Sequence, residues 1–289
     1  MIKFKNSKLH SKFIKDGCVK FDLLNNVEVQ KLRDLYFDHK EEHLVVKNMM
    51  HSTTDTFNVD LILKLDEKIK NILVPKLSDI LHEYDHILSS FMVKESGDNS
   101  QTSYHQDPTL VDSDEYMSAN IWVALQDTNS ENGNLCVVKG SHRITDCLVV
   151  TPDFPAFFNK FKDQIPEYST EIPVKSGQAI IFDNKLIHGA TANHSGKERI
   201  AAVLSIKSKQ AKWNFYYLEP GNPESKIERY AFDTKSFAEL KKNQRPSSKF
   251  LGYHNYNFKQ LDYKHFKQFM LKNYPLEYIR ANIKLFNMS

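Results

Sequence analysis

The short stretch Tyr104–Asp107, with the letters YHQD, places a histidine and an aspartate two residues apart. On a β-strand, residues i and i+2 point to the same face, so His105 and Asp107 would present an imidazole and a carboxylate together. These are two of the three ligands of a 2-His-1-carboxylate site, which leaves one side of an Fe(II) ion open. About one His-x-Asp spacing is expected by chance in a chain with 12 histidines, so the flanking sequence must decide.

The best candidate for the third ligand is His188. It follows a short apolar run, QAIIF, and a DNK turn, and Arg199 opens the run RIAAVLSI further along the chain. If the intervening NHSGKE stretch is a turn, the two runs are antiparallel neighbours and Arg199 lies beside His188. A buried arginine is costly unless it is paired. Its guanidinium group is suited to a carboxylate that accepts two parallel hydrogen bonds.

A second metal motif competes with this one. Residues 82–86 read HEYDH, a literal H-E-x-x-H, which binds zinc when both histidines lie on one face of a helix. Here the helical period ends at Leu81, a strand-like run begins at Ile87, and no nearby residue supplies an obvious third ligand. We therefore interpret His82 and His86 as part of a polar helix end, and zinc hydrolysis through them as an alternative.

The elements that would position these residues change character along the chain. Helical spacing of apolar residues predicts a helix over 26–43, capped by Asn26. It also predicts helix over 58–83, where Pro75 is expected to end one helix and start the next. Apolar or alternating runs separated by turn-like clusters then indicate β-strands at 87–94, 117–126, 135–139, 171–174, 178–182 and 199–206. Many short strands are typical of a sandwich or barrel.

Two of these strands have distinct faces. One face of each is fully apolar: Ile121, Val123 and Leu125 in the first, and Ile200, Ala202, Leu204 and Ile206 in the second. The opposite faces are mixed and suited to line a pocket: Trp122, Ala124 and Gln126, and Arg199, Ala201, Val203 and Ser205. Residues 147–170 interrupt the strands as a possible lid or insertion, and 233–244 and 262–286 are expected to be mostly helical.

Composition sets limits on the class of protein. The formal charge of +3 is too small to indicate nucleic-acid binding. No run of 18 apolar residues predicts a membrane span, and no signal-peptide pattern opens the sequence. Cys18, Cys136 and Cys147 fit neither a disulfide framework nor a cysteine zinc site, so buried thiols and a cytoplasmic location are expected.

The letters YHQD, then SANIWVALQDTNSENGNLCVVKGSHR, then SGQAIIFDNKLIHGATANHSGKER resemble the phytanoyl-CoA dioxygenase family of iron(II)/2-oxoglutarate oxygenases, over about residues 87–207. The resemblance implies a mainly β fold, a double-stranded β-helix (jelly-roll, cupin-like), with helices packed outside. We expect a single domain in 1–289, with helical support in 1–86, the core in 87–207 and a helical C-terminal extension in 208–289.

The resemblance also implies roles for individual residues. His105, Asp107 and His188 would bind iron, Arg199 would hold the distal carboxylate of 2-oxoglutarate, and Trp122 and Gln126 would lie near this cosubstrate. Related halogenases replace the carboxylate ligand with a small residue, so Asp107 implies hydroxylation or a related oxidation and not halogenation. We expect hydroxylation of a small-molecule C–H bond with O2, releasing succinate and CO2. A catalytically silent binding protein of the same fold is the alternative. The expected partner is a small-molecule substrate, and no membrane partner is expected. The sequence leaves the oligomeric state open.

Overall fold

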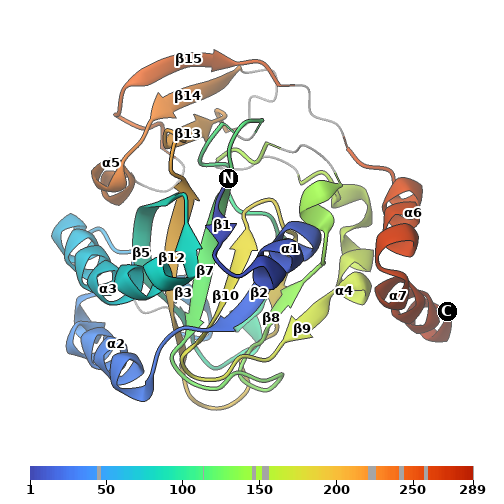
Figure 1. Cartoon of the computed structure of the whole chain (residues 1–289), viewed down its shortest axis with the longest axis horizontal. Helices are drawn as coiled ribbons and strands as arrows, with labels where there is room; N and C mark the ends of the chain where they lie inside the picture. The colour runs from blue at the N-terminus through green and yellow to red at the C-terminus, as the bar shows by residue number, and fades with distance from the viewer. Residues whose placement is uncertain are drawn as a thin grey trace.

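Two β-sheets face each other at the centre of the computed structural model (Figure 1). The structure describes residues 1–43, 47–112, 114–144, 148–151, 156–220, 226–240, 244–256 and 260–288, those from 283 on by their backbone alone. The larger sheet has the order β2 (Cys18–Asp22), β10 (Gln178–Asp183), β7 (Ser118–Ala124), β12 (Arg199–Ser208), β5 (Tyr84–Lys94) and β3 (Met50–Ser52). The smaller has the order β6 (Thr102–His105), β11 (His188–Ala190), β8 (Leu135–Val137) and β9 (Thr170–Ile172).

The alternating residues of β7 and β12 separate two apolar layers. Ile121 and Val123 of β7 lie with Leu204 of β12 in the layer under the helices. Trp122 of β7 and Val203 of β12 lie in the other layer, between the sheets. All six predicted strands are present, and the predicted jelly-roll core with flanking helices is confirmed.

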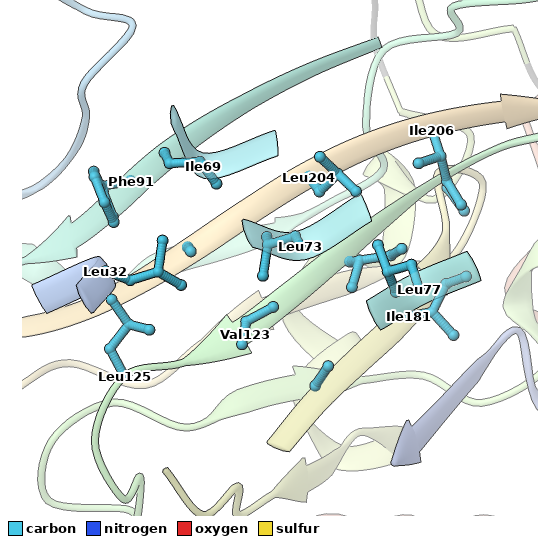
Figure 2. Packing of buried hydrophobic residues seen from close by; sticks show 14 of the residues in the cluster. Leu32, Ile69, Leu73, Leu77, Phe91, Val123, Leu125, Ile181, Leu204 and Ile206 are labelled. Atoms are coloured by element: carbon cyan, nitrogen blue, oxygen red, sulfur yellow. The ribbon is translucent and has the colours of Figure 1, made fainter. Parts of the chain in front are cut away.

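Three helices cover the outer face of the larger sheet: α1 (Ser7–Asp16), α2 (Asn26–Asp38) and α3 (Val59–Ile80). Figure 2 shows Leu73 and Leu77 of α3 directed at the strands, near Val123, Ile181 and Leu204. Leu73 is fully buried, and complete burial of a leucine side chain contributes about 1.5–3 kcal/mol relative to leaving it in water. This packing fixes the sheet from behind and leaves its other face toward the smaller sheet.

Two helix-boundary predictions were wrong. The N-cap of α2 is Asn25, not Asn26, and it forms a capping box with Glu28, in which each side chain accepts the other's backbone N–H. Pro75 lies inside α3 and does not end it. A proline there removes one backbone hydrogen bond, but Leu73 and Leu77 anchor the helix to the sheet on both sides of it.

The segment predicted as helical support also contributes strands. β2 and β3 form the two edges of the larger sheet, and β1 (Lys3–Phe4) pairs with β4 (Leu81–His82). Short 3-10 helices occupy Lys40–Glu42, Asp98–Ser100, Ser141–Arg143 and Asn159–Gln164. The core described by the structure therefore begins before residue 87.

The C-terminal part begins with a three-stranded sheet, β13 (Asn214–Tyr217), β14 (Ile227–Ala231) and β15 (Phe250–His254), and then turns helical (Figure 1). α5 (Thr234–Glu239) lies in the predicted helix 233–244, of which 241–243 lie outside the described residues. α6 (Tyr263–Asn273) and α7 (Pro275–Met288) confirm the prediction for 262–286.

The stretch considered as a lid or insertion packs against these last helices. Phe158, Phe161 and α4 (Ile165–Tyr168) form an apolar cluster with Phe266 and Met270 of α6. Residues 147 and 152–155 of this stretch lie outside the described residues.

The cysteines in the described ranges are Cys18 and Cys136, both buried free thiols as predicted; Cys147 lies outside those ranges. A search of the described helices finds none with the length and apolar character needed to cross a bilayer.

Candidate metal centre

The two histidines of the predicted triad lie side by side because β6 and β11 are antiparallel neighbours, with His105 and His188 as register partners. The strands approach closely here: a Cβ on Gly189 would lie 2.8 Å from the carbonyl oxygen of Thr102. Asp107 lies just beyond β6, and its backbone N–H donates to the Asn184 carbonyl at 2.9 Å. The ligand atoms of His105, Asp107 and His188 all lie within 4.8 Å of one another.

Both imidazole rings are oriented by backbone carbonyl groups. His105 Nδ1 lies 2.8 Å from the Ser103 oxygen, and His188 Nδ1 lies 3.0 Å from the Leu186 oxygen. Because a carbonyl oxygen only accepts, each Nδ1 must carry the proton, which leaves a lone pair on Nε2. The two Nε2 atoms lie 3.6 Å (His105) and 3.7 Å (His188) from Asp107 Oδ1. The two Nε2 atoms and Asp107 Oδ1 are therefore close enough to bind the same metal ion.

The second oxygen of Asp107 is already engaged. Asn120 donates from Nδ2 to Asp107 Oδ2 at 2.6 Å, and the Ser205 hydroxyl donates to Asn120 Oδ1. These bonds leave Oδ1 as the free ligand atom. Sequence reasoning missed Asn120, although its position two residues before Trp122 on β7 placed it on the pocket face.

The electrostatics of the triad favour a charged carboxylate. Burial alone would raise the pKa of Asp107, but its interactions with the protonated forms of His188 and His105 and the donated N–H of Asn120 outweigh it and hold that pKa below its usual value. Despite its burial, the pKa of His105 is raised by the same interaction with Asp107. Burial lowers the pKa of His188, which favours the neutral imidazole that a metal requires.

A cavity of about 140 Å³ separates the triad from Arg199, and both contribute to its walls. Arg199 is only 4% exposed, its guanidinium carbon lies 5.0 Å from the centroid of the Trp122 ring, and its Nε has no hydrogen-bond partner among the described residues. Burial lowers the pKa of Arg199 to about 10, which still leaves it charged at neutral pH. An orphaned, buried cation facing a cavity fits the carboxylate of an incoming ligand.

The predicted pairing of the strands that carry His188 and Arg199 was wrong. β11 belongs to the smaller sheet, whereas β12 lies in the larger one between β7 and β5. The chain crosses from one sheet to the other between these strands. The two residues therefore face the same cavity from different sheets.

Trp122 lines this cavity, whereas Gln126 is not among the lining residues. The Gln126 amide accepts from the Ile200 backbone N–H and from Arg33, each at 3.2 Å, and donates to the Glu198 carbonyl at 2.9 Å. It thus ties the ends of two strands together, and a role near the cosubstrate stays a prediction.

The competing zinc motif has no helix to carry it. His82 lies in β4, Glu83 has a left-handed φ of 60°, and His86 lies in β5. His86 Nε2 contacts Asp66 at 3.0 Å and the Ser89 hydroxyl at 2.9 Å. The interpretation of these histidines as a helix end was also wrong, since α3 ends at Ile80.

The donor set fits iron. Two imidazole nitrogens and one carboxylate oxygen on neighbouring positions form the three-ligand arrangement of non-haem Fe(II) oxygenases. A search of the described residues for three or more metal-binding side chains close enough to share an ion finds this group.

A second, larger cavity adjoins the triad. It has a volume of about 320 Å³ and shares Asp107 with the first. Apolar side chains such as Phe13, Val111 and Met117 line it together with Arg143. Two cavities thus share Asp107, one of them lined by Arg199 and the other by this mixture of apolar and charged residues.

The described core is a jelly roll that carries a His-Asp-His triad and, across a cavity, a buried arginine. The family model of phytanoyl-CoA dioxygenase (PhyH) matches residues 21–201, more than half of the chain. The chain belongs to this family, whose cofactors are Fe(II) and 2-oxoglutarate.

Similar proteins support the assignment. Phytanoyl-CoA dioxygenase domain-containing protein 1 of Danio rerio is 30% identical over 153 residues, which cover 48% of this chain and 53% of that protein. Phytanoyl-CoA dioxygenase 1 of Oryza sativa subsp. japonica is 29% identical over 127 residues, 42% of this chain and 43% of that protein. The matched stretch thus spans about half of each relative.

Solved structures share the fold at low identity. The non-heme alpha ketoglutarate dependent carbocyclase SnoK from nogalamycin biosynthesis has a TM-score of 0.56 and 18% identity, with 76% of this chain and 89% of that chain covered. The non-heme alpha ketoglutarate dependent epimerase SnoN, also from nogalamycin biosynthesis, has a TM-score of 0.53 and 16% identity. The match covers 88% of this chain and 98% of that chain.

Proposed function

We propose that this protein is an Fe(II)- and 2-oxoglutarate-dependent dioxygenase that hydroxylates an unactivated C–H bond of a small molecule. The observation that carries the proposal is the triad of His105, Asp107 and His188 facing the uncompensated Arg199 across one cavity. The chemistry supplied by bound Fe(II), 2-oxoglutarate and O2 is insertion of one oxygen atom into the C–H bond, with the other entering succinate as CO2 is released.

The residues of the chain would divide the work of binding and orientation. His105 and His188 offer Nε2 because their Nδ1 protons are held by backbone carbonyls. Asp107 offers one oxygen because Asn120 holds the other. Arg199 would hold the distal carboxylate of 2-oxoglutarate, and the buried Trp122 beside it would keep water from the guanidinium.

The substrate would enter the larger cavity, since this space shares Asp107 with the first cavity but is not lined by Arg199. Its apolar lining suits a hydrocarbon portion close to the triad. Arg143 and Glu115 in the same lining offer charged groups of both signs to polar parts of a substrate. We therefore propose a small molecule with an apolar reactive portion and polar substituents.

The test is an anaerobic titration of the full chain with Fe(II) and 2-oxoglutarate, followed by a screen of metabolites for stimulated succinate release in air. We expect a visible absorption band that needs both components, because 2-oxo acids chelate ferrous iron. Failure of the wild-type protein to bind 2-oxoglutarate in the presence of Fe(II) would refute the proposal. Binding without succinate release for any metabolite would favour the silent binding protein.

A matched pair of histidine variants makes the titration specific. His188→Ala is expected to lose the metal, since His188 is one of three ligands. His194→Ala is the control, because the His194 side chain is 57% exposed and lies outside both cavities. Equal metal binding by the two variants would contradict the assignment of the triad.

A further inference from the structure

Asp183 and Asn184 are buried polar residues in the wall of the larger cavity. Asp183 ends β10 and is 9% exposed, and Asn184, the next residue, is 4% exposed. Both residues line the cavity of about 320 Å³ that also reaches Asp107. The binding of metal and cosubstrate, as proposed above, uses neither of them.

The side-chain oxygen of Asn184 has no partner. Oδ1 is buried and accepts no hydrogen bond from the described residues, whereas Nδ2 lies 3.5 Å from the Pro108 carbonyl oxygen. Because a carbonyl oxygen only accepts, this contact assigns Nδ2 to the Pro108 side. The Asn184 backbone is fixed by two hydrogen bonds, to the Ser118 carbonyl at 3.1 Å and from the Asp107 N–H at 2.9 Å. The residue with the unpaired oxygen is therefore held next to a metal ligand.

Asp183 supplies a charged acceptor. Its Oδ1 accepts from the Lys185 backbone N–H at 2.8 Å, the hydrogen bond of a turn that an asparagine would make equally well. In the ranges that the structure covers, no hydrogen bond or ion pair to Oδ2 is found. Burial raises the pKa of Asp183 to about 6, against the Lys185 N–H and charge, so the carboxyl is mostly ionised at neutral pH. A buried charge without a partner is unfavourable.

The arginine of the same wall does not satisfy these oxygens. The Arg143 guanidinium carbon lies 5.6 Å from the centroid of the Phe269 ring, and its Nη2 donates to the Tyr274 hydroxyl at 3.4 Å. Two neighbouring acceptor atoms, Asp183 Oδ2 and Asn184 Oδ1, thus lack a donor among the described residues. Buried polar groups normally have a hydrogen-bond partner. The pair of acceptors is explained if the cavity receives a molecule with an N–H or O–H group.

We propose that Asp183, with Asn184 beside it, is the specificity site of the larger cavity and binds a hydrogen-bond donor of the substrate, an ammonium or a hydroxyl group. A site built to accept a hydrogen bond rejects analogues that lack the donor, because its buried acceptor is then left unpaired. The substrate class is therefore a small molecule that joins an apolar portion to an amine or an alcohol. This inference rests on the proposed function, since it names the substrate class of that same site.

The wild-type full chain tests the donor requirement first. It is loaded with Zn(II) and 2-oxoglutarate, which allow no turnover, and titrated in ligand-observed NMR. The probes are benzylamine, benzyl alcohol and toluene, which share one apolar ring and differ in carrying an ammonium, a hydroxyl or neither. We expect one of the two polar probes to bind more tightly than toluene. With paramagnetic Mn(II) in place of Zn(II), the signals of that probe should broaden, which locates it near the triad.

Two variants then test the residues. Asp183→Asn keeps the turn hydrogen bond but loses the charge. It should weaken binding of the preferred probe about 10-fold or more, as expected for a hydrogen bond to a charged group, and leave toluene binding unchanged. Asn184→Ala should cause a smaller loss, because it removes a neutral acceptor. Asp127→Asn is the control, since Asp127 accepts the Ser176 backbone N–H at 2.8 Å in the same manner but is not among the residues that line either cavity.

The outcomes separate this inference from the proposed function. If the metal-loaded wild type does not bind 2-oxoglutarate, the proposed function fails and the inference with it. If it does, the inference alone is overturned when toluene binds as tightly as both polar probes, or when Asp183→Asn and Asp127→Asn bind the preferred probe equally. Preference for benzylamine assigns an amine substrate and preference for benzyl alcohol an alcohol, and both support the inference. If Asp183→Asn does not fold, the comparison of Asn184→Ala with the wild type decides in its place.

Discussion

Replacing Asn120 with alanine is expected to weaken metal binding without removing a metal ligand. The Asn120 amide donates to Asp107 Oδ2 at 2.6 Å and is itself fixed by the Ser205 hydroxyl. Without it, Asp107 can rotate, and its second oxygen is left buried without this donor. A hydrogen bond to a charged group contributes about 1.5–3 kcal/mol. Since about 1.4 kcal/mol corresponds to tenfold, metal affinity should fall by about 10- to 100-fold.

The assay is competition between the protein and a chelator for Co(II), followed by the visible absorption of the bound ion under anaerobic conditions. Ser205→Ala should cause a smaller loss, because it only loosens Asn120. Urea unfolding of the metal-free variants separates a local effect from a general loss of stability. An Asn120→Ala protein that folds normally and binds Co(II) within about twofold of the wild type would refute the role of this hydrogen bond.

Three other perturbations have defined outcomes. Arg199→Met should retain the metal but bind 2-oxoglutarate about 30-fold or more weakly in calorimetry with Ni(II), because a buried ion pair loses a partner; loss of the metal would contradict its role. Leu73→Ala should lower the free energy of unfolding in urea by about 2–5 kcal/mol, and a negligible loss would contradict the packing in Figure 2. Stability should decrease as pH falls from 6.5 to about 4, because burial lowers the pKa of His43 to about 4 and the unfolded state then binds more protons. His43→Phe should flatten this slope in urea titrations at several pH values, and an unchanged slope would contradict the assignment.

The chemistry of the site could be predicted because a short motif carried both residue type and spacing. His105 and Asp107 had to share a side of the chain at a strand end, and a third ligand had to come from a distant strand. The structure brings His188 beside His105 as a register partner. The family resemblance supplied the expected roles, and the strand faces of β7 and β12 were readable from alternation alone.

Strand partners were not predictable in the same way. A period of two indicates which face is buried but not which strand lies alongside, so β11 and β12 were placed in one sheet although they belong to two. Asn120 was on the predicted pocket face, but no sequence rule told that its amide would reach Asp107.

The pairing of β2 with β10 has a consequence for synthesis on the ribosome. Cys18 is the register partner of Phe182, so the first strand of the larger sheet waits for one made much later. At translation rates of about 5–20 residues per second, that delay is on the order of 10 s or more. During this interval the apolar residues Val19 and Phe21 have no sheet to join. The nascent segment that carries β2 is therefore open to chaperones and to misassociation until β10 has been made.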